Sequence, residues 1–375
     1  MKRLRLVIDA QIPFMKGFAE KLGEVRYIPG ADITATDVHD ADALIVRTRT
    51  RCDRQLLEGS GVRFIATATI GFDHIDTDYL KEAGIGWTNC PGCNAASVGQ
   101  YVKCCLLELA AHGCWSTGQK CLTPLDEPIA PDDFHKDVFS RLTLGIVGCG
   151  HVGKEVYKAM KDLGFKHILC CDPPLAEAED SPYVPYKPLE VLAKECDIIT
   201  FHTPLTREPH PHPTYHLADD AFFHQLKPTA VVINSSRGEV VDNQALKAAL
   251  EEGRIRAAVV DTWEGEPHID RELLRLAFIG TPHIAGYSAD GKANGTRMSL
   301  QAVARFFGIS DIDFTQVTAP ALPQGFEYDE TLRNGKVLEE LALYDPSRDA
   351  RELKLHPEEF EKQRGHYPLR REHLD

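Results

Sequence analysis

The chain has 375 residues, of which 43% are hydrophobic and 26% are charged, a composition typical of a folded protein with room for two or three domains. Its formal net charge of −14 argues against nucleic acid or an anionic membrane as a partner, but not against a small anionic substrate that meets a local cluster of cations. No stretch reaches transmembrane length and the N-terminal apolar run is too short for a signal peptide, so the eleven cysteines are expected to be reduced thiols in a cytoplasmic protein.

The first ninety residues alternate short apolar runs with helix-sized segments. The runs at 4–9, 43–47 and 63–69 are predicted to be buried strands, because each is short, apolar and rich in branched residues. The segment 95–109 has helical periodicity and many small residues, which predicts a closely packed helix. A polar segment with several prolines, 118–136, then leads to the most informative motif of the chain.

That motif is a G-x-G-x-x-G at the end of an apolar run, LTLGIVGCGHVG at 142–153. Glycines in this pattern let the backbone turn tightly and approach a pyrophosphate at a helix N-terminus. A second apolar run, HILCC, ends in Asp172, whose carboxylate can accept hydrogen bonds from the adenosine ribose and would repel a 2′-phosphate. The sequence therefore predicts NAD, not NADP, as the cofactor. The cofactor-binding residues predicted from the motif are Gly148, Gly150, His151, Val152, Gly153 and Asp172.

Further apolar runs at 167–172, 197–202, 230–235 and 257–261 are separated by helix-sized segments, which predicts a parallel sheet covered on both faces. Because the glycine motif opens well inside the chain, the nucleotide-binding domain is expected to be inserted into a smaller α/β domain. The expected boundaries are 1–94 with 286–309 for the smaller domain, 95–285 for the nucleotide domain, and 310–375 for an appended C-terminal domain.

Three loops after the motif carry groups suited to hydride transfer from a 2-hydroxy acid. Arg237 can hold the substrate carboxylate, and His283 has the intrinsic acidity to take the hydroxyl proton. Glu266 beside that histidine would orient its ring. Each residue also has an ordinary structural interpretation, namely a loop salt bridge, a strand-end hydrogen bond and a turn. Loops at the carboxyl ends of parallel strands gather at one edge, which favours convergence.

The sequence resembles the D-isomer-specific 2-hydroxyacid dehydrogenases over nearly its whole length. The resemblance is carried by segments such as ALIVRTRT, CPGCNAASVGQYV, INSSRGEVVDNQAL, DTWEGEP, TPHIAGYSADGKANGT and HYPLRRE. It implies a Rossmann NAD domain, a flavodoxin-like substrate (lid) domain and a C-terminal domain that builds a homodimer. The implied reaction is oxidation of 4-phospho-D-erythronate, a small phosphorylated hydroxy acid, in pyridoxal phosphate (vitamin B6) biosynthesis.

The resemblance also assigns roles residue by residue. Arg237, Glu266 and His283 are implied as catalytic, with His283 the proton donor and acceptor. The further cofactor contacts it implies are Thr203, Ser235, Ser236, Arg237, Asp261 and Gly286. The substrate contacts it implies are Thr48, Thr69 and Tyr287.

A cluster of cations follows the strand at 43–47. Arg47, Arg49 and Arg51 alternate with threonines in an otherwise acidic protein, so Arg47 and Arg49 are predicted to bind a substrate phosphate together with hydroxyl donors. The alternative is that these arginines lie along one exposed strand face.

Two other groups of residues invite a metal site. His210, His212 and His216 lie in one loop with several prolines, but no fixed carboxylate or thiol pair is near them in the sequence, so a solvated loop and no metal are predicted. Cys90 and Cys93 form a single C-x-x-C without a second pair at a suitable spacing, which favours structural thiols.

Two alternatives to the phosphoerythronate enzyme stay open from the sequence. One is a related dehydrogenase of the phosphoglycerate or glyoxylate/hydroxypyruvate type. The other is a non-catalytic NAD(H)-sensing interaction protein, since a fold alone does not establish an activity.

Overall fold

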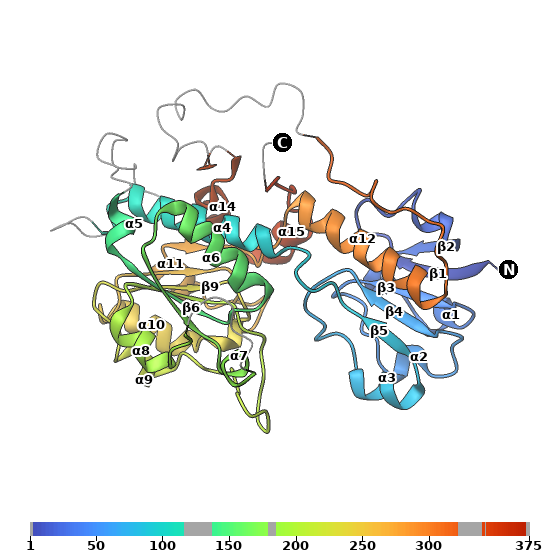
Figure 1. Ribbon diagram of the computed structural model, residues 1–375, viewed down its shortest axis with the longest axis horizontal. Coiled ribbons are helices and arrows are strands. Elements are labelled where there is room, and N and C mark those ends of the chain that lie inside the picture. Colours follow the sequence, from blue (N-terminus) through green and yellow to red (C-terminus); the bar gives the residue numbers. More distant parts are fainter. Residues whose placement is uncertain (1–2, 116–136, 179–184, 322–339, 342, 373–375) are drawn as a thin grey trace. The chain divides into compact units, whose positions relative to one another are not determined.

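A computed structural model describes residues 3–115, 137–178, 185–321, 340–341 and 343–372 (Figure 1). The chain divides into two compact units, unit 1 with residues 1–94 and 287–322 and unit 2 with residues 95–286 and 323–374. The polar segment predicted at 118–136 lies outside the described residues.

Unit 1 contains a parallel sheet of five strands in the order β2-β1-β3-β4-β5. The central strands β3 (Ala43–Val46) and β4 (Phe64–Thr67) are buried along their whole length, because helices and loops cover both faces. This strand order is that of flavodoxin-like domains, so the predicted fold class is confirmed for this unit. The other strands are β1 (Leu4–Asp9), β2 (Gly23–Ile28) and β5 (Gly86–Thr88).

The helices of unit 1 include one that the chain supplies on its return from unit 2. This helix, α12 (Ala289–Phe306), begins at Ser288, whose side chain accepts a hydrogen bond from the Gly291 amide, and it packs against β4 (Figure 1). Near its end Phe306 stacks on Phe64 with ring centroids 4.5 Å apart. The helices between the strands are short: α1 (Ala35–Val38), α2 (Arg54–Leu57) and α3 (Thr77–Ala83).

Unit 2 contains a parallel sheet of six strands in the order β11-β10-β9-β8-β6-β7. The chain passes from β6 to its neighbour β7 on one side and then crosses back to β8 on the other side of β6. In open sheets of this kind, ligands bind outside the carboxyl ends of the strands where the order reverses. The Rossmann prediction is confirmed. The strands are β6 (Thr143–Val147), β7 (His167–Cys171), β8 (Ile198–Phe201), β9 (Val231–Asn234), β10 (Ala257–Val260) and β11 (Ile279–Gly280).

Two long helices pack side by side in unit 2, α4 (Ala95–Ala111) and α6 (His151–Leu163) (Figure 1). Gly99 allows the close approach, since a Cβ there would lie 3.3 Å from the carbonyl oxygen of Glu155. The helix predicted at 95–109 is therefore confirmed, two residues longer than expected. The shorter helices are α5 (Asp137–Arg141), α7 (Pro173–Glu177), α8 (Leu189–Glu195), α9 (Asp220–Phe223), α10 (Asn243–Glu251) and α11 (Arg271–Leu276).

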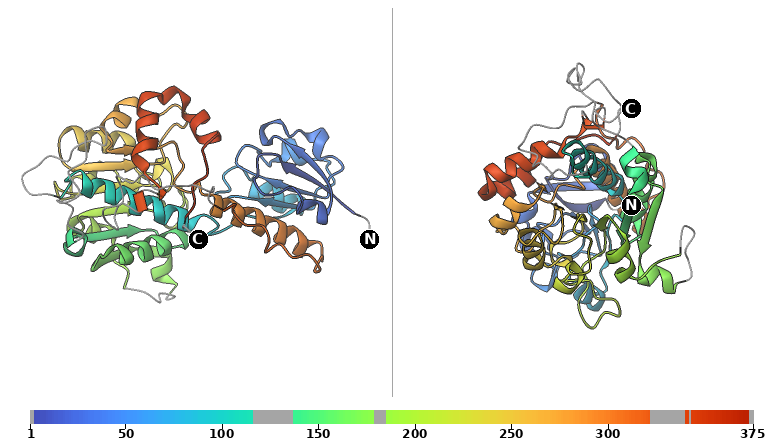
Figure 2. Two further views of the ribbon diagram at one scale, coloured as in Figure 1. Left: turned by 90° about the horizontal axis from the view of Figure 1, so that it is seen from above. Right: turned by 90° about the vertical axis from the view of Figure 1, so that its left-hand side faces the viewer.

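The described residues from 340 to 372 pack on unit 2. Helix α14 (Pro346–Leu355) contacts α4 and β11, and it is followed by α15 (Phe360–Gly365) (Figure 2). Leu353 and Phe360 are 0% and 1% exposed within the unit 2 core. The sequence suggested a separate domain at 310–375. In the described parts of this segment, Phe314 and Val317 are buried in the unit 1 core, and Leu341, Leu353 and Phe360 are buried in the cores of unit 2. The described residues at 310–321 therefore belong to unit 1 and those from 340 on to unit 2, while the predicted domain boundaries stay a prediction. In the described part of the chain, no helix combines the length and apolarity needed to cross a bilayer.

Candidate active site

The glycine motif adopts the turn that its sequence requires. Gly148 has φ +88°, and a Cβ there would lie 2.7 Å from the carbonyl carbon of His202 at the end of β8. At Gly153 a Cβ would lie 2.1 Å from the carbonyl oxygen of Gly148. These two glycines let the start of α6 pack tightly against the ends of β6 and β8, at the reversal of the strand order.

Gly150, the middle glycine of the motif, has open space beside it where the other two glycines have close contacts. A Cβ on Gly150 would have no atom within 4 Å, and Gly150 caps α6 without any side-chain hydrogen bond to the helix amides. His151 and Val152 open the first turn of this helix of 13 residues. Open space beside uncapped amides at a helix N-terminus suits a pyrophosphate, so the residues present fit a dinucleotide.

The loop after β8, which contacts the glycine turn, carries polar side chains. The Thr203 hydroxyl is buried and has no hydrogen-bond partner among the described residues, which is costly unless a ligand supplies one. Beside it, Nε2 of His202 lies 2.9 Å from the Thr200 hydroxyl, and Nδ1 lies 3.4 Å from that of Ser235. Burial lowers the pKa of His202 to about 3, so the ring is neutral at physiological pH.

Asp172 ends β7 next to the glycine turn. One of its carboxylate oxygens accepts the Cys149 amide at 2.7 Å and the other accepts the Leu175 amide at 3.1 Å, capping α7. Each oxygen keeps a second lone pair for another donor, and the side chain is only partly buried. The position therefore suits an acceptor for ribose hydroxyls, as the sequence predicted.

Replacing Asp172 with asparagine is expected to lower the preference for NADH over NADPH by about tenfold or more, because repulsion between the carboxylate and a 2′-phosphate disappears. An asparagine oxygen can still accept the Cys149 amide that Asp172 bonds. The dissociation constants of both nucleotides can be measured by nicotinamide fluorescence. Asp162→Asn, on the exposed face of α6, is the control, and an unchanged preference in D172N would contradict this role.

Glu266 and His283 form the centre of the candidate site. Nδ1 of His283 lies 2.9 and 3.1 Å from the two carboxylate oxygens of Glu266. The Trp263 amide donates to the same carboxylate at 2.9 Å. Burial raises the pKa of Glu266, but these interactions outweigh it, so the pKa of this carboxyl lies below its ordinary value. With Nδ1–H donated to a carboxylate, Nε2 is the ring nitrogen left to take up a proton.

A buried carboxylate holds the backbone on which His283 stands. Asp261, which is 1% exposed, accepts the amides of Ile284 at 2.7 Å and Ala285 at 3.0 Å, and the Thr281 hydroxyl at 2.7 Å. Burial raises the pKa of Asp261. His283 itself has φ +58°, an uncommon conformation that this bonding fixes. Asp261 thus supports the loop of His283, and its predicted contact with the cofactor stays a prediction.

Arg237 lies in the loop after β9, between the strands that lead to Thr203 and Asp261. Its guanidinium donates to the Ser236 carbonyl at 2.8 Å, and the Ser236 hydroxyl donates to Asn234 at 2.8 Å. The next residue must be glycine, because a Cβ on Gly238 would lie 2.0 Å from the Trp263 carbonyl oxygen. The loop of Arg237 is therefore packed directly against the loop of Glu266.

The predicted substrate contacts all lie in unit 1. Gly286, a predicted cofactor contact, is the last residue before the chain returns to unit 1 and belongs to unit 2. Thr48 and Arg49 are exposed in the turn after β3, and Arg47 donates to the Gln11 carbonyl at 2.8 Å. Thr69, after the neighbouring β4, donates to the Gly71 carbonyl at 2.8 Å. Arg51 pairs with Asp53. The turns after β3 and β4 share the carboxyl edge of the sheet.

Near the N-terminus of α12, Tyr287 carries the ammonium group of Lys292 3.7 Å from its ring centre. The sequence did not single out this lysine, which adds a cation beside one of the predicted substrate contacts. The C-x-x-C pair is buried in the same unit, where the Cys90 thiol lies 3.3 Å from the Ser299 hydroxyl, as expected of a structural thiol.

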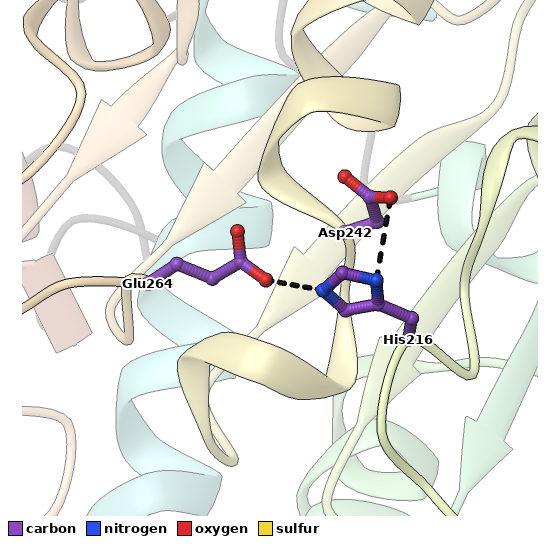
Figure 3. A group of neighbouring side chains, drawn as sticks. All are labelled: His216, Asp242 and Glu264. Atoms are coloured by element: carbon purple, nitrogen blue, oxygen red, sulfur yellow. Dashed lines mark hydrogen bonds and ion pairs between the residues drawn. The ribbon is translucent and has the colours of Figure 1, made fainter.

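The histidine loop differs from its prediction at one position. His216 is half-buried and has two carboxylate partners: its two ring nitrogens lie 3.4 Å from Asp242 and 2.5 Å from Glu264 (Figure 3). These carboxylates come from segments distant in sequence, which is why the sequence did not reveal them. Since both nitrogens already face a carboxylate, the group links the loop after Arg237 to the loop before Glu266. His210 is exposed, and His212 is half-buried and pairs with Glu177.

Two arginines at the C-terminus also reach this region of unit 2, and sequence reasoning missed both. Arg364 lies 3.5 Å from Glu266, and Arg370 donates to the carbonyls of Ile284 and Ala285. No periodicity or motif could have assigned them, because both contacts depend on how the C-terminal segment packs.

Comparisons with known proteins agree with this geometry. Residues 125–285 match the family described as D-isomer specific 2-hydroxyacid dehydrogenase, NAD binding domain. The chain is 50% identical to the erythronate-4-phosphate dehydrogenase of Bacteroides thetaiotaomicron, over 98% of this chain and 97% of that protein. It is 41% identical to the enzyme of the same name from Porphyromonas gingivalis, over 98% and 94% of the two chains.

Solved structures show the same fold at lower identity. A D-lactate dehydrogenase from Aquifex aeolicus in complex with NAD and lactic acid aligns with a TM-score of 0.65 at 24% identity, over 85% of this chain and all of that one (100%). A 3-phosphoglycerate dehydrogenase from Entamoeba histolytica with bound NAD aligns with a TM-score of 0.63 at 23% identity, over 83% of this chain and 97% of that one. These solved structures show the shared fold. The full-length relatives and the family match establish that the chain belongs to the D-isomer specific 2-hydroxyacid dehydrogenases, a family of NAD-dependent oxidoreductases, in the branch that contains the erythronate-4-phosphate dehydrogenases.

Proposed function

We propose that this protein oxidises 4-phospho-D-erythronate at its 2-hydroxyl to 2-oxo-3-hydroxy-4-phosphobutanoate, with NAD as the hydride acceptor, as a step of vitamin B6 biosynthesis. The observation that carries the proposal is the His283–Glu266 pair beside the Arg237 loop, next to a glycine turn that fits a dinucleotide. The substrate is inferred from the relatives named erythronate-4-phosphate dehydrogenase.

The reaction requires a base, a carboxylate-binding group and a hydride acceptor. Nε2 of His283 takes the proton of the 2-hydroxyl, while the electron pair of that O–H bond forms the new C=O bond. Glu266 holds the ring through Nδ1 and stabilises the imidazolium that forms. Arg237 pairs with the substrate carboxylate and polarises the developing ketone oxygen. NAD, when bound, supplies the acceptor for the hydride that leaves C2.

The two alternatives predict different requirements. A sensor that only binds NAD(H) has no use for an imidazole held by a buried carboxylate, so the Glu266–His283 pair favours an enzyme. A related dehydrogenase of the glyoxylate/hydroxypyruvate type acts on an unphosphorylated acid and needs no phosphate-binding cations, whereas one of the phosphoglycerate type would need them too. Thr48 and Arg49 after β3 and Lys292 beside Tyr287 provide hydroxyl and cationic groups suited to a phosphate.

The test is a nicotinamide absorbance assay with 4-phospho-D-erythronate, NAD and a 2-oxo acid that can reoxidise any NADH held by the enzyme. Unphosphorylated erythronate, 3-phosphoglycerate and glycolate are run in parallel. Turnover that requires the phosphate supports the proposal. A preference for 3-phosphoglycerate or glycolate would move the protein to another branch of the family, and NADH binding without turnover on any of them would favour the sensor.

Replacing Arg49 with glutamine is expected to lower kcat/KM for 4-phospho-D-erythronate by about 10- to 100-fold, the value of one hydrogen bond to a charged group. Most of the loss should be in KM, since the phosphate lies away from the reacting carbon. Arg51→Gln is the matched control, because Arg51 is exposed and paired with Asp53. An equal loss in both variants would contradict a specific role for Arg49.

We further propose that the protein is a cytoplasmic homodimer. The proposal for the dimer comes from the resemblance of the C-terminal segment to a dimerisation domain, and light scattering of the purified protein tests it. The compartment is supported by the cysteines, because the ten described ones are all buried and none is joined in a disulfide, as suits a reducing environment.

A further inference from the structure

The C-terminal helix α15 brings an unexpected charge to the catalytic pair. A guanidinium nitrogen of Arg364, Nη1, lies 3.5 Å from Oε2 of Glu266, the oxygen that lies 2.9 Å from Nδ1 of His283. One carboxylate is therefore shared between an imidazole and a guanidinium. All three side chains are largely buried, with 20%, 18% and 26% exposed for Arg364, Glu266 and His283.

We propose that Arg364 is a positioning residue of the reaction, which shares the Glu266 carboxylate with His283 and thereby sets the pH at which His283 acts as a base. This role goes beyond those proposed for Arg237, Glu266 and His283, and it rests on the function proposed above. Arg364 acts through Glu266, and no contact between Arg364 and substrate or cofactor is implied.

The position of Arg364 is fixed by packing within unit 2. Phe360, one helical turn earlier, is 1% exposed in the unit 2 core. Residues four apart on a helix lie on the same face, so burial of Phe360 turns Arg364 toward the unit. Arg370 anchors the same segment a few residues later through the carbonyls of Ile284 and Ala285. The two attachments on either side keep Arg364 at the catalytic loop.

The electrostatic consequence follows from the charges of the three groups. Glu266 alone would favour protonated His283, because the pair is then neutral and otherwise carries one negative charge. With Arg364 present, the positive charge of Arg364 and the negative charge of Glu266 cancel when His283 is neutral. The Arg364 charge also contributes to the low pKa of Glu266, after burial, which raises it, and after His283 and the Trp263 amide, which lower it. Arg364 thus favours the form of His283 that accepts a proton.

Other charged groups near the pair are few among the described residues. Asp261 lies behind the His283 loop, where it bonds the amides of Ile284 and Ala285. Glu361, on the same helix, lies 4.0 Å from Nη1 of Arg364. The Asp261 carboxylate is engaged in its own hydrogen bonds, and the Glu361 carboxylate offsets part of the Arg364 charge. Both are present in every variant below, so differences between variants report on Arg364.

The alternative is that Arg364 merely fastens α15 to the unit. A fastening role predicts a loss of stability, or of kcat at every pH, without movement of the pH profile. The proposed role predicts that Arg364→Gln moves the acid limb of kcat/KM for oxidation to higher pH, by about 0.5–1.5 units. Arg364→Lys, which restores the charge, should recover most of the shift. Lys362→Gln on the same helix, where Lys362 pairs with Glu359, should leave the profile unchanged.

A second readout needs no substrate and separates this proposal from the proposed function. In protein labelled with ¹³C at histidine, the His283 resonance is identified by its absence in His283→Asn, and its titration is followed by NMR. We expect the titration midpoint to rise in R364Q and to return toward wild type in R364K, even if 4-phospho-D-erythronate is not the substrate. An unchanged midpoint in folded R364Q, or an equal rise in R364K, overturns the role of Arg364. Absence of turnover by wild type with a shifted midpoint overturns only the proposed substrate.

Discussion

Replacing His283 with asparagine is expected to lower kcat for oxidation by about 10²- to 10⁴-fold, the usual contribution of a general base. Asparagine is the informative substitution because His283 has φ +58°, and asparagine tolerates the left-handed region better than most residues. The amides of Ile284 and Ala285 should keep their bonds to Asp261, so the loop should persist. The measurement is kcat from NADH absorbance with saturating substrate.

The dissociation constant of NADH should stay within about threefold of wild type (under 1 kcal/mol), which separates lost chemistry from lost binding. His167→Asn is a suitable control, because His167 is exposed at the amino end of β7, the edge of the sheet away from the glycine turn. A kcat that falls less than tenfold in H283N would assign proton transfer to another group.

Replacing Arg370 with methionine is expected to lower the free energy of unfolding of unit 2 by about 3–5 kcal/mol, because several hydrogen bonds from a charged donor at a buried position are lost. Arg370 is 8% exposed and donates to Gln100 at 2.9 Å, Ile284 at 3.0 Å and Ala285 at 2.6 Å. Its guanidinium also lies 4.0 Å from the Tyr344 ring centre. Methionine fills much of the volume but leaves the acceptors unpaired.

Urea unfolding followed by tryptophan fluorescence measures this effect, since Trp263 is buried in unit 2 at 2% exposure. Arg348→Met is the matched control in the same segment: Arg348 is 73% exposed and pairs with Asp345 across one helical turn, so about 0.5 kcal/mol or less is expected. If the free energy of unfolding falls no more in R370M than in R348M, the acceptors must find other donors. Arg370 then does not hold the C-terminal segment on unit 2.

The sequence by itself predicted the parts of this protein that local patterns encode. Short apolar runs and helix-sized spacers predicted parallel sheets. Gly148 and Gly153 predicted the turn at β6, because only glycine avoids the clashes found at these two positions. Asp172 followed from its fixed distance to that turn. Arg237, Glu266 and His283 were predicted because each follows a strand of one sheet, and such strand ends share an edge; the structure brings Glu266 and His283 together.

Only the tertiary structure decided which distant segments meet. Nothing near His216 in sequence predicted carboxylates, yet Asp242 and Glu264 converge on it because two loops fold against each other. Nothing in the sequence of the charged C-terminal segment predicted that Phe360 is buried in unit 2, or that Arg364 and Arg370 reach the loops of Glu266 and His283. Periodicity and motifs report neighbours within one element or one turn. Contacts between residues far apart in the sequence depend on chain packing, which leaves no regular spacing in the sequence.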